Sequence, residues 1–232
     1  MVSSSDFRVP LVFDYVATFS WAASGAVVAI RKRFDIVGVF VVALLSSIGG
    51  GLLRDGFFLQ RIPSLLVIPV YLPLIAFSTL LMIVLARHLT QISNNENFGK
   101  LVDVIDALGT PAFAVVGMQL AQDKHIPIFG VIFIGVVNGV AGGLLRDMVV
   151  REVPALLRPG QFSALTLVAA CCLFELLTAY YHTNPTRSAW STVAAFFVVR
   201  ALTVRFNWQS RPILREVDKS PKGASRAEPR LL

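Results

Sequence analysis

Seven apolar stretches dominate this sequence, and each is about as long as a helix that crosses a lipid bilayer. A spanning helix needs about 20 apolar residues, at a rise of about 1.5 Å per residue. The chain is 55% hydrophobic and only 15% charged, whereas soluble domains carry about 25% charged residues. The sequence therefore predicts an all-α polytopic membrane protein, with seven transmembrane helices near residues 11–30, 36–59, 65–85, 101–120, 127–150, 164–180 and 188–204.

An internal repeat divides these helices into two groups. The string Gly-Gly-Leu-Leu-Arg-Asp occupies residues 50–55 and again residues 142–147, and Asp14 and Asp106 are separated by the same offset. Residues 11–90 and 101–181 are thus predicted to be two copies of one three-helix unit. Because three crossings reverse the direction of the chain, the second copy must be inverted relative to the first. A seventh helix, in residues 186–206, lies outside the repeat.

The charges in the connections predict an orientation. Residues 1–10 form a short N-terminal segment, and residues 207–232 form a basic tail that is predicted to be disordered. If the chain crosses the membrane seven times, the basic residues fall on one side except for Arg8, Arg54, Arg61, Lys124 and Arg187. Excess positive charge marks the cytoplasmic side, so the N-terminus is expected outside and the C-terminus in the cytoplasm.

The second and fifth helices are unusual because each combines consecutive glycines with an Arg-Asp pair. Glycine pairs are common places for a kink, and a charge at a helix centre in lipid costs about 2.5–3.5 kcal/mol on the milder scale. We expect the glycines to open the two helices around an ion pathway, with the arginines neutralised by ion pairs. Alternatively, the glycines serve helix packing and the pairs lie at the headgroups. The residues are Gly49, Gly50, Gly51, Arg54 and Asp55, and Gly142, Gly143, Arg146 and Asp147.

Further polar residues are candidates for the same pathway. Ser46, Ser47 and Asn138 precede the glycines by about one turn and would add oxygen atoms. Asp14 and Asp106 begin the first helix of each copy, so inversion places them at opposite faces of the membrane. There they would form acidic pore mouths that concentrate cations. The alternative is that each aspartate simply stabilises the helix dipole.

Other classes of function find no support in the sequence. It contains no phosphate-binding loop, no Ser-His-Asp arrangement and no zinc motif, so neither an enzyme nor a metal site nor a cofactor is predicted. The basic residues lie between apolar stretches rather than in a pattern for binding nucleic acid. Arg200 and Arg205, near the end of the last helix, are expected to extend to the lipid headgroups.

The duplicated Gly-Gly-x-x-Arg-Asp motif, in the second and fifth of seven helices, resembles the prokaryotic branch of the trimeric intracellular cation (TRIC) channel family. The same bacterial sequences are also grouped as a "glycine transporter" domain family. The resemblance covers about residues 11–205. It implies a homotrimer in the lipids of a bacterial or archaeal cell (inner) membrane, with one pathway per protomer for K⁺ and Na⁺, and a preference for potassium.

Two alternatives to a channel remain open at this point. A secondary transporter for a small zwitterion such as glycine needs the same bent helices, and an Arg-Asp pair could bind a carboxylate and an ammonium group. A membrane scaffold without transport is the third class, although it has no need for charged pairs beside the glycines.

Overall fold

The computed structural model describes residues 11–89, 95–157 and 163–206, and every regular element within them is a helix. The predicted all-α fold is therefore confirmed for this part of the chain, whereas the predictions for residues 1–10 and 207–232 lie outside it. The elements are α1 (Val12–Arg31), α2 (Ile36–Leu52), the π-helix η2 (Leu53–Phe58), α3 (Ser64–Val67), α4 (Tyr71–Leu89), α5 (Asn95–Asp123), α6 (Ile128–Val149), the 3₁₀-helix η3 (Ala155–Leu157), α7 (Ser163–Glu175), the π-helix η4 (Leu176–Tyr180) and α8 (Pro185–Arg205).

Length and apolar composition mark this chain as an integral membrane protein. Within the described residues, four helices are long and apolar enough to cross a membrane, namely Val12–Arg31, Ile36–Phe58, Leu101–Asp123 and Ile128–Val149. Tyr71–Ala86 and Ala164–Tyr180 are shorter apolar helices. Large apolar side chains cover the outside of the bundle; Phe129, for example, is 88% exposed and Phe57 is 74% exposed. Water would penalise such a surface, whereas lipid accommodates it.

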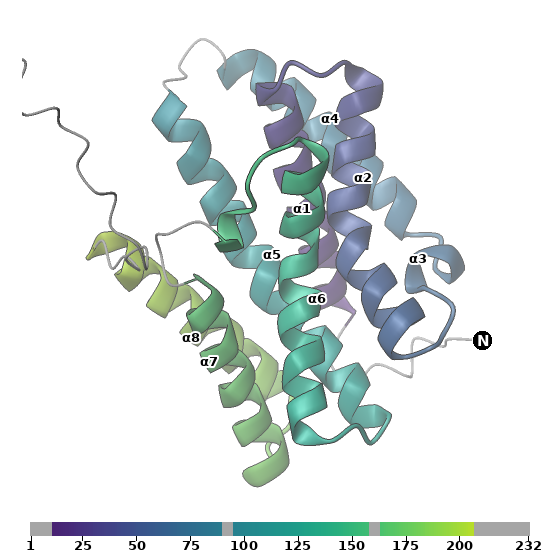
Figure 1. The fold of residues 1–232 in the computed structure, drawn as a ribbon, viewed down its shortest axis with the longest axis vertical. Coiled ribbons are helices and arrows are strands. Elements are labelled where there is room, and N and C mark those ends of the chain that lie inside the picture. Colours follow the sequence, from purple (N-terminus) through teal and green to yellow (C-terminus); the bar gives the residue numbers. More distant parts are fainter. Residues whose placement is uncertain (1–10, 90–94, 158–162, 207–232) are drawn as a thin grey trace, which may run out of the picture.

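Helix α1 lies in the middle of the bundle and packs against α2, α4 and α5 (Figure 1). Helix α2 crosses α6, and the neighbouring helices α7 and α8 cover one flank of the bundle beside α5 and α6. The buried face of α1 carries the small residues Ala17, Ala22, Ala26 and Ala29. Small side chains allow helix backbones to approach closely in a membrane, so α1 can contact three neighbours at once.

The third predicted helix, at 65–85, is wrong as a single element. Helix α3 ends at Val67, and α4 begins only at Tyr71. Pro69 explains the interruption, because a proline lacks the backbone N–H and disfavours helical geometry in the residue before it. That residue, Ile68, has extended angles of φ −100° and ψ 113°. Helix α5 also begins earlier than predicted, at Asn95.

The glycines do not open the helices. Helix α6 runs without interruption from Ile128 to Val149, through Gly142 and Gly143. Helix α2 likewise continues past its three glycines to Leu52, and the irregular turn follows as the π-helix Leu53–Phe58. The expectation of opened turns at the glycines is therefore wrong. A π-helical turn accommodates one extra residue, which accounts for the loss of register between the two copies after the Arg-Asp motif.

Candidate functional site

The first charged group, here called the Arg54 cluster, contains Asp14, Arg54, Asp55, Arg61, Ser64 and Tyr71. Arg54 donates from Nε and Nη2 to the two carboxylate oxygens of Asp55, at 2.6 and 3.0 Å, and from Nη1 to Asp14 at 3.1 Å. Arg54 is 1% exposed and Asp55 is fully buried. A buried charge requires an opposite charge and hydrogen bonds. The predicted neutralisation of Arg54 by ion pairing is thus present, with a second carboxylate supplied by α1.

The other members of the Arg54 cluster attach the following chain to the motif. The backbone N–H and the hydroxyl of Ser64 both donate to Asp55 Oδ2, at 2.9 Å. Arg61 donates to Asp55 Oδ1 at 2.9 Å, and the Tyr71 hydroxyl donates to Asp14. Asp55 therefore holds the start of α3, and Asp14 holds the start of α4.

The second group, the Arg146 cluster, contains Ser24, Asp106, Arg146, Asp147 and Ala155. Arg146 donates from Nε to Asp147 Oδ1 at 2.8 Å and from Nη1 to both oxygens of Asp106 at 3.0 Å. Its Nη1 also donates to the Ser24 hydroxyl. The backbone N–H of Ala155 donates to Asp147 Oδ2 at 2.9 Å. Arg146 is 3% exposed, so this guanidinium is also buried between two carboxylates.

The two clusters are built alike from residues that share the sequence offset. Asp14 contacts Arg54 as Asp106 contacts Arg146. In each cluster the motif aspartate accepts the backbone N–H of the residue that follows a proline, Ser64 in one and Ala155 in the other. From the sequence, Asp14 and Asp106 are predicted to lie at pore mouths, separate from the Arg-Asp motifs, but in the structure each is bonded to the motif arginine of its own copy.

Helices α2 and α6 meet at a backbone contact, here called the glycine crossing, formed by Ser46, Gly50, Asn138 and Gly142. A Cβ atom on Gly50 would lie 2.5 Å from the carbonyl oxygen of Asn138, and one on Gly142 would lie 2.5 Å from the carbonyl oxygen of Ser46. The two contacts are again related by the offset. No side chain fits at either position, so these two glycines are required for the close approach.

The polar side chains at and beside the crossing differ in how well they are bonded. The Ser46 hydroxyl donates to the Gly142 carbonyl at 3.4 Å, and Ser47 donates to Leu44 of its own helix at 2.9 Å. The Asn138 amide donates to the Phe113 carbonyl, but Asn138 Oδ1 is buried and has no hydrogen-bond partner within the described residues. A buried carbonyl oxygen without a hydrogen bond lowers the stability of a protein. Asn138 Oδ1 is such an atom, and it lies at the crossing, between the two clusters.

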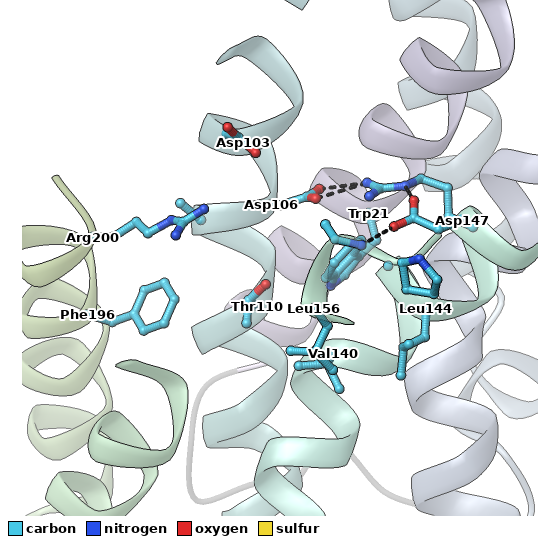
Figure 2. A pocket seen from close by; sticks show the side chains of 15 residues that line it. Trp21, Asp103, Asp106, Thr110, Val140, Leu144, Asp147, Leu156, Phe196 and Arg200 are labelled. Carbon is cyan, nitrogen blue, oxygen red and sulfur yellow. Dashed lines mark hydrogen bonds and ion pairs between the residues drawn. The ribbon is translucent and has the colours of Figure 1, made fainter. Parts of the chain in front are cut away.

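A small cavity adjoins each cluster. The Arg54 cavity measures about 20 Å³ and the Arg146 cavity about 80 Å³ (Figure 2). Beyond the crossing, α2 continues to the Arg54 cavity and α6 to the Arg146 cavity, and the two cavities share no described lining residue. Residues related by the offset line both: Asp14, Thr18, Leu52, Arg54 and Phe113 in one, and Asp106, Thr110, Leu144, Arg146 and Trp21 in the other.

Several residues of the site were not predicted from the sequence. Trp21 and Phe113 could have been found, since they share the offset and line equivalent positions. The Arg146 guanidinium carbon also lies 5.8 Å from the Trp21 ring centre, within cation–π range. Arg200 lines the Arg146 cavity rather than only extending to headgroups as expected. The remaining members, with no signal in the sequence, are Ser24, Arg61, Ser64, Tyr71 and Asp103.

A family model described as "Glycine transporter" matches residues 11–87 and again residues 103–179. The chain belongs to the glycine transporter family. It is 31% identical to a UPF0126 membrane protein of Deinococcus radiodurans, over 72% of this chain and 76% of that protein. It is also 31% identical to the UPF0126 inner membrane protein YadS of Escherichia coli K12, over 72% of this chain and 77% of that protein.

Solved structures confirm the resemblance of this glycine transporter family member to TRIC channels. One, described under "Structural basis for conductance through TRIC cation channels", matches with a TM-score of 0.76 and 26% identity, over 88% of this chain and 97% of that chain. The TRIC orthologue from Rhodobacter sphaeroides has the same fold, with a TM-score of 0.77 and 23% identity, over 89% of this chain and all of the other. Family and fold are thus of the channel or transporter type.

Proposed function

We propose that this protein is a passive channel for monovalent cations that prefers potassium. Its pathway runs within each protomer from the Arg54 cavity, past the glycine crossing, to the Arg146 cavity. One observation carries the proposal: equivalent residues line a cavity on either side of the glycine crossing between α2 and α6. The similarity to a structure of TRIC cation channels, at 26% identity, supports it.

The charges of the two clusters favour cations over anions. Each buried motif arginine contacts two aspartates, so carboxylates outnumber the guanidinium at both ends. Excess negative charge in a narrow site raises the local concentration of cations. Arg61 offsets this excess at Asp55, so the Arg146 end has the stronger attraction. In this proposal Asp14 and Asp106 act at the two pore mouths.

Conduction requires α2 and α6 to separate, because backbone atoms fill the crossing in this structure. The glycines supply the necessary freedom, since they bend a helix at low cost. In the proposal, Gly49, Gly50 and Gly51 allow α2 to bend, and Gly142 and Gly143 allow α6 to bend. Movement at the crossing would join the two cavities and expose the unpaired oxygen of Asn138 to the ion.

The proposed architecture has seven membrane-spanning helices in two inverted three-helix repeats plus α8, with the N-terminus outside and the C-terminus in the cytoplasm. The two matches to one family model support the repeat, as do the contacts shared by equivalent residues. We further propose a homotrimer in membrane lipid, following the TRIC resemblance.

A carrier for a small zwitterion is the second candidate, and the family description "Glycine transporter" favours it. A substrate carboxylate would be bound by a guanidinium with free N–H groups. In the Arg54 cluster, however, each of the three guanidinium nitrogens already donates to Asp14 or Asp55. A substrate carboxylate there would have to compete with two aspartates that are already bonded to the guanidinium, which makes the channel the better proposal.

Single-channel recording of the purified protein in planar bilayers separates the two candidates. Under a potassium-to-sodium gradient, a channel gives discrete currents with a reversal potential that favours potassium. Currents that do not saturate in the millimolar range would support it further. If folded, inserted protein stays silent and the same preparation takes up labelled glycine in a saturable manner, the carrier replaces the channel.

A further inference from the structure

Helix α8 adds a charge to the Arg146 cavity that the repeated motif does not supply. Arg200 lines this cavity, and in Figure 2 its side chain extends from α8 toward the helix that carries Asp103 and Asp106. Its Nη1 atom is buried and has no hydrogen-bond partner within the described residues. Electrostatic interaction couples Arg200 to both aspartates. The guanidinium therefore lies near these carboxylates without a direct bond to either of them.

The two carboxylates that Arg200 faces differ in whether they form a direct bond with another side chain. Asp103 and Asp106 are one helical turn apart on α5, so both point to the same side of that helix. Asp106 is bonded to Arg146 at 3.0 Å. Asp103 has no hydrogen bond or ion pair among the described residues, and its electrostatic interactions include one with Arg200. Without Arg200, the cavity would present three aspartates against one arginine.

Among the described residues, the Arg54 cavity has no counterpart of Asp103 and Arg200. The sequence offset places Leu11 at the position of Asp103, and α8 is outside the repeat, so Arg200 has no partner position. The extra arginine of the Arg54 cluster, Arg61, is instead bonded directly to Asp55 at 2.9 Å. Within the described chain, only the Arg146 cavity therefore contains both a carboxylate without a direct bond, Asp103, and an arginine side chain without a direct bond, Arg200.

We propose that Arg200 is a tethered cation that makes conduction through the pathway asymmetric. Beside Asp103 and Asp106 it occupies the place that a permeating cation would otherwise take, so the cavity attracts fewer cations from that end. Current driven in through the Arg146 cavity is then smaller than it would be without Arg200, and the ratio of the currents in the two directions depends on this charge. This inference rests on the proposed channel function and concerns its regulation by α8.

Single-channel currents in symmetrical potassium chloride test this role. The current ratio at equal positive and negative voltages is compared for wild type, Arg200→Gln and Arg200→Met, which remove the charge. A unit charge a few ångströms away in a watery site changes local ion concentration roughly two- to threefold. The ratio should shift by that factor in both variants, because the current that enters through the Arg146 cavity increases relative to the opposite current. Arg200→Lys keeps the charge and should keep the wild-type ratio.

Arg205→Gln is the matched control, because Arg205 is an exposed arginine of the last turn of the same helix and does not line the cavity. If it alters the ratio as much as Arg200→Gln does, the effect is one of general surface charge and the inference is wrong. A conducting wild type with unchanged ratios in both neutral variants also overturns the inference but leaves the channel intact. Folded wild type without cation current rejects the channel, and the inference with it.

Discussion

The buried arginines are stable in this fold because two carboxylates from different helices surround each of them. Arg54 takes one partner from its own motif and the other, Asp14, from α1. Removing one partner of a buried ion pair leaves a charge without compensation, at a cost of about 3–5 kcal/mol. Asp14 therefore has a structural role in addition to any attraction for cations at a pore mouth.

Asp14→Asn is expected to lower the melting temperature of the detergent-solubilised protein strongly, because Arg54 loses a partner while it remains buried. The double variant Asp14→Asn/Arg54→Gln should recover part of the loss, since no unpaired charge is then left. Asp35→Asn is the control: Asp35 is an exposed N-cap of α2 that accepts the Gly38 N–H at 2.7 Å, and asparagine caps a helix about as well, so this variant should melt close to wild type. Equal melting temperatures for Asp14→Asn and Asp35→Asn would contradict this account.

Neighbouring glycines of the motif are expected to differ sharply in their tolerance of alanine. A Cβ on Gly50 would meet the Asn138 carbonyl at 2.5 Å, whereas one on Gly51 would meet only the Arg54 side chain, at 3.8 Å. Gly50→Ala should therefore destabilise the protein by about 1–3 kcal/mol through overpacking, and Gly51→Ala should not. Thermal unfolding in detergent measures both. If the two variants have the same melting temperature, α2 and α6 are not in backbone contact at this position.

Only part of the site's residue chemistry can be predicted from the sequence. An Arg-Asp pair in an apolar stretch must be neutralised, and that requirement identifies Arg54 and Arg146 without any structure. The contribution of Tyr71 to the same cluster cannot be predicted, because it depends on how α4 packs against α1. The Arg200 side chain has an equally plausible position at the headgroups, and only the packing of α8 decides between the two.

At the scale of elements, the two halves reach the same contacts by different local structures. Between the motif aspartate and the residue after the proline, the first half has one residue more than the second. The extra residue lies in the π-helix Leu53–Phe58, yet Ser64 and Ala155 donate to their aspartates at the same distance, 2.9 Å. The π-helical turn is thus an insertion that the rest of the fold has absorbed.

Deletion of Gly56 tests this interpretation. A Cβ at Gly56 would meet nothing within 4 Å, so the residue fills no packing position. Its removal should convert the π-helical turn to α-helix and give the first half the same spacing between the motif aspartate and the proline as the second half has. The melting temperature should stay nearly unchanged. Deletion of Leu144 is the matched control, because it would rotate the end of α6 by about 100° and misplace Arg146. A Gly56 deletion as damaging as that of Leu144 would show that the π-helical turn is required.

The positions of the helices were predictable where the apolar pattern alone determines them. They were not predictable where the backbone conformation of particular residues interrupts a helix. Hydropathy identifies α1, α2, α5 and α6 because lipid requires about 20 apolar residues in a row. It cannot reveal the break before α4, since Ile68, Pro69 and Val70 are apolar but unable to continue a helix through the proline. The role of the glycines was not predictable for a related reason: consecutive glycines allow a helix to bend, but in this structure they serve close packing.

At the scale of the whole molecule, the connections agree with two units related by inversion. Helices α1 and α5 each end two residues before a non-glycine residue with positive φ, Arg33 at 60° and His125 at 56°, and these two residues share the sequence offset. Lys32, in the first of these turns, forms an ion pair with Glu152, beyond the end of α6, at 2.7 Å. The α1–α2 turn and the chain after α6 therefore lie at the same end of the bundle. Lys124 is the residue equivalent to Lys32. It follows α5, which begins at that same end of the bundle, so Lys124 lies at the opposite end.

Labelling of these two equivalent lysine positions tests inversion and orientation together. In a Cys172→Ala background, which removes the exposed cysteine and leaves Cys171 buried, Lys124→Cys should react with a membrane-impermeant maleimide on intact cells. Lys32→Cys should react only after permeabilisation, because positive charge marks the cytoplasmic side. Losing the Lys32 ion pair, which is partly exposed, costs at most about 1 kcal/mol, so both variants should fold. The reverse pattern would place the N-terminus inside and keep the inversion, whereas labelling of both positions from one side would exclude two inverted units.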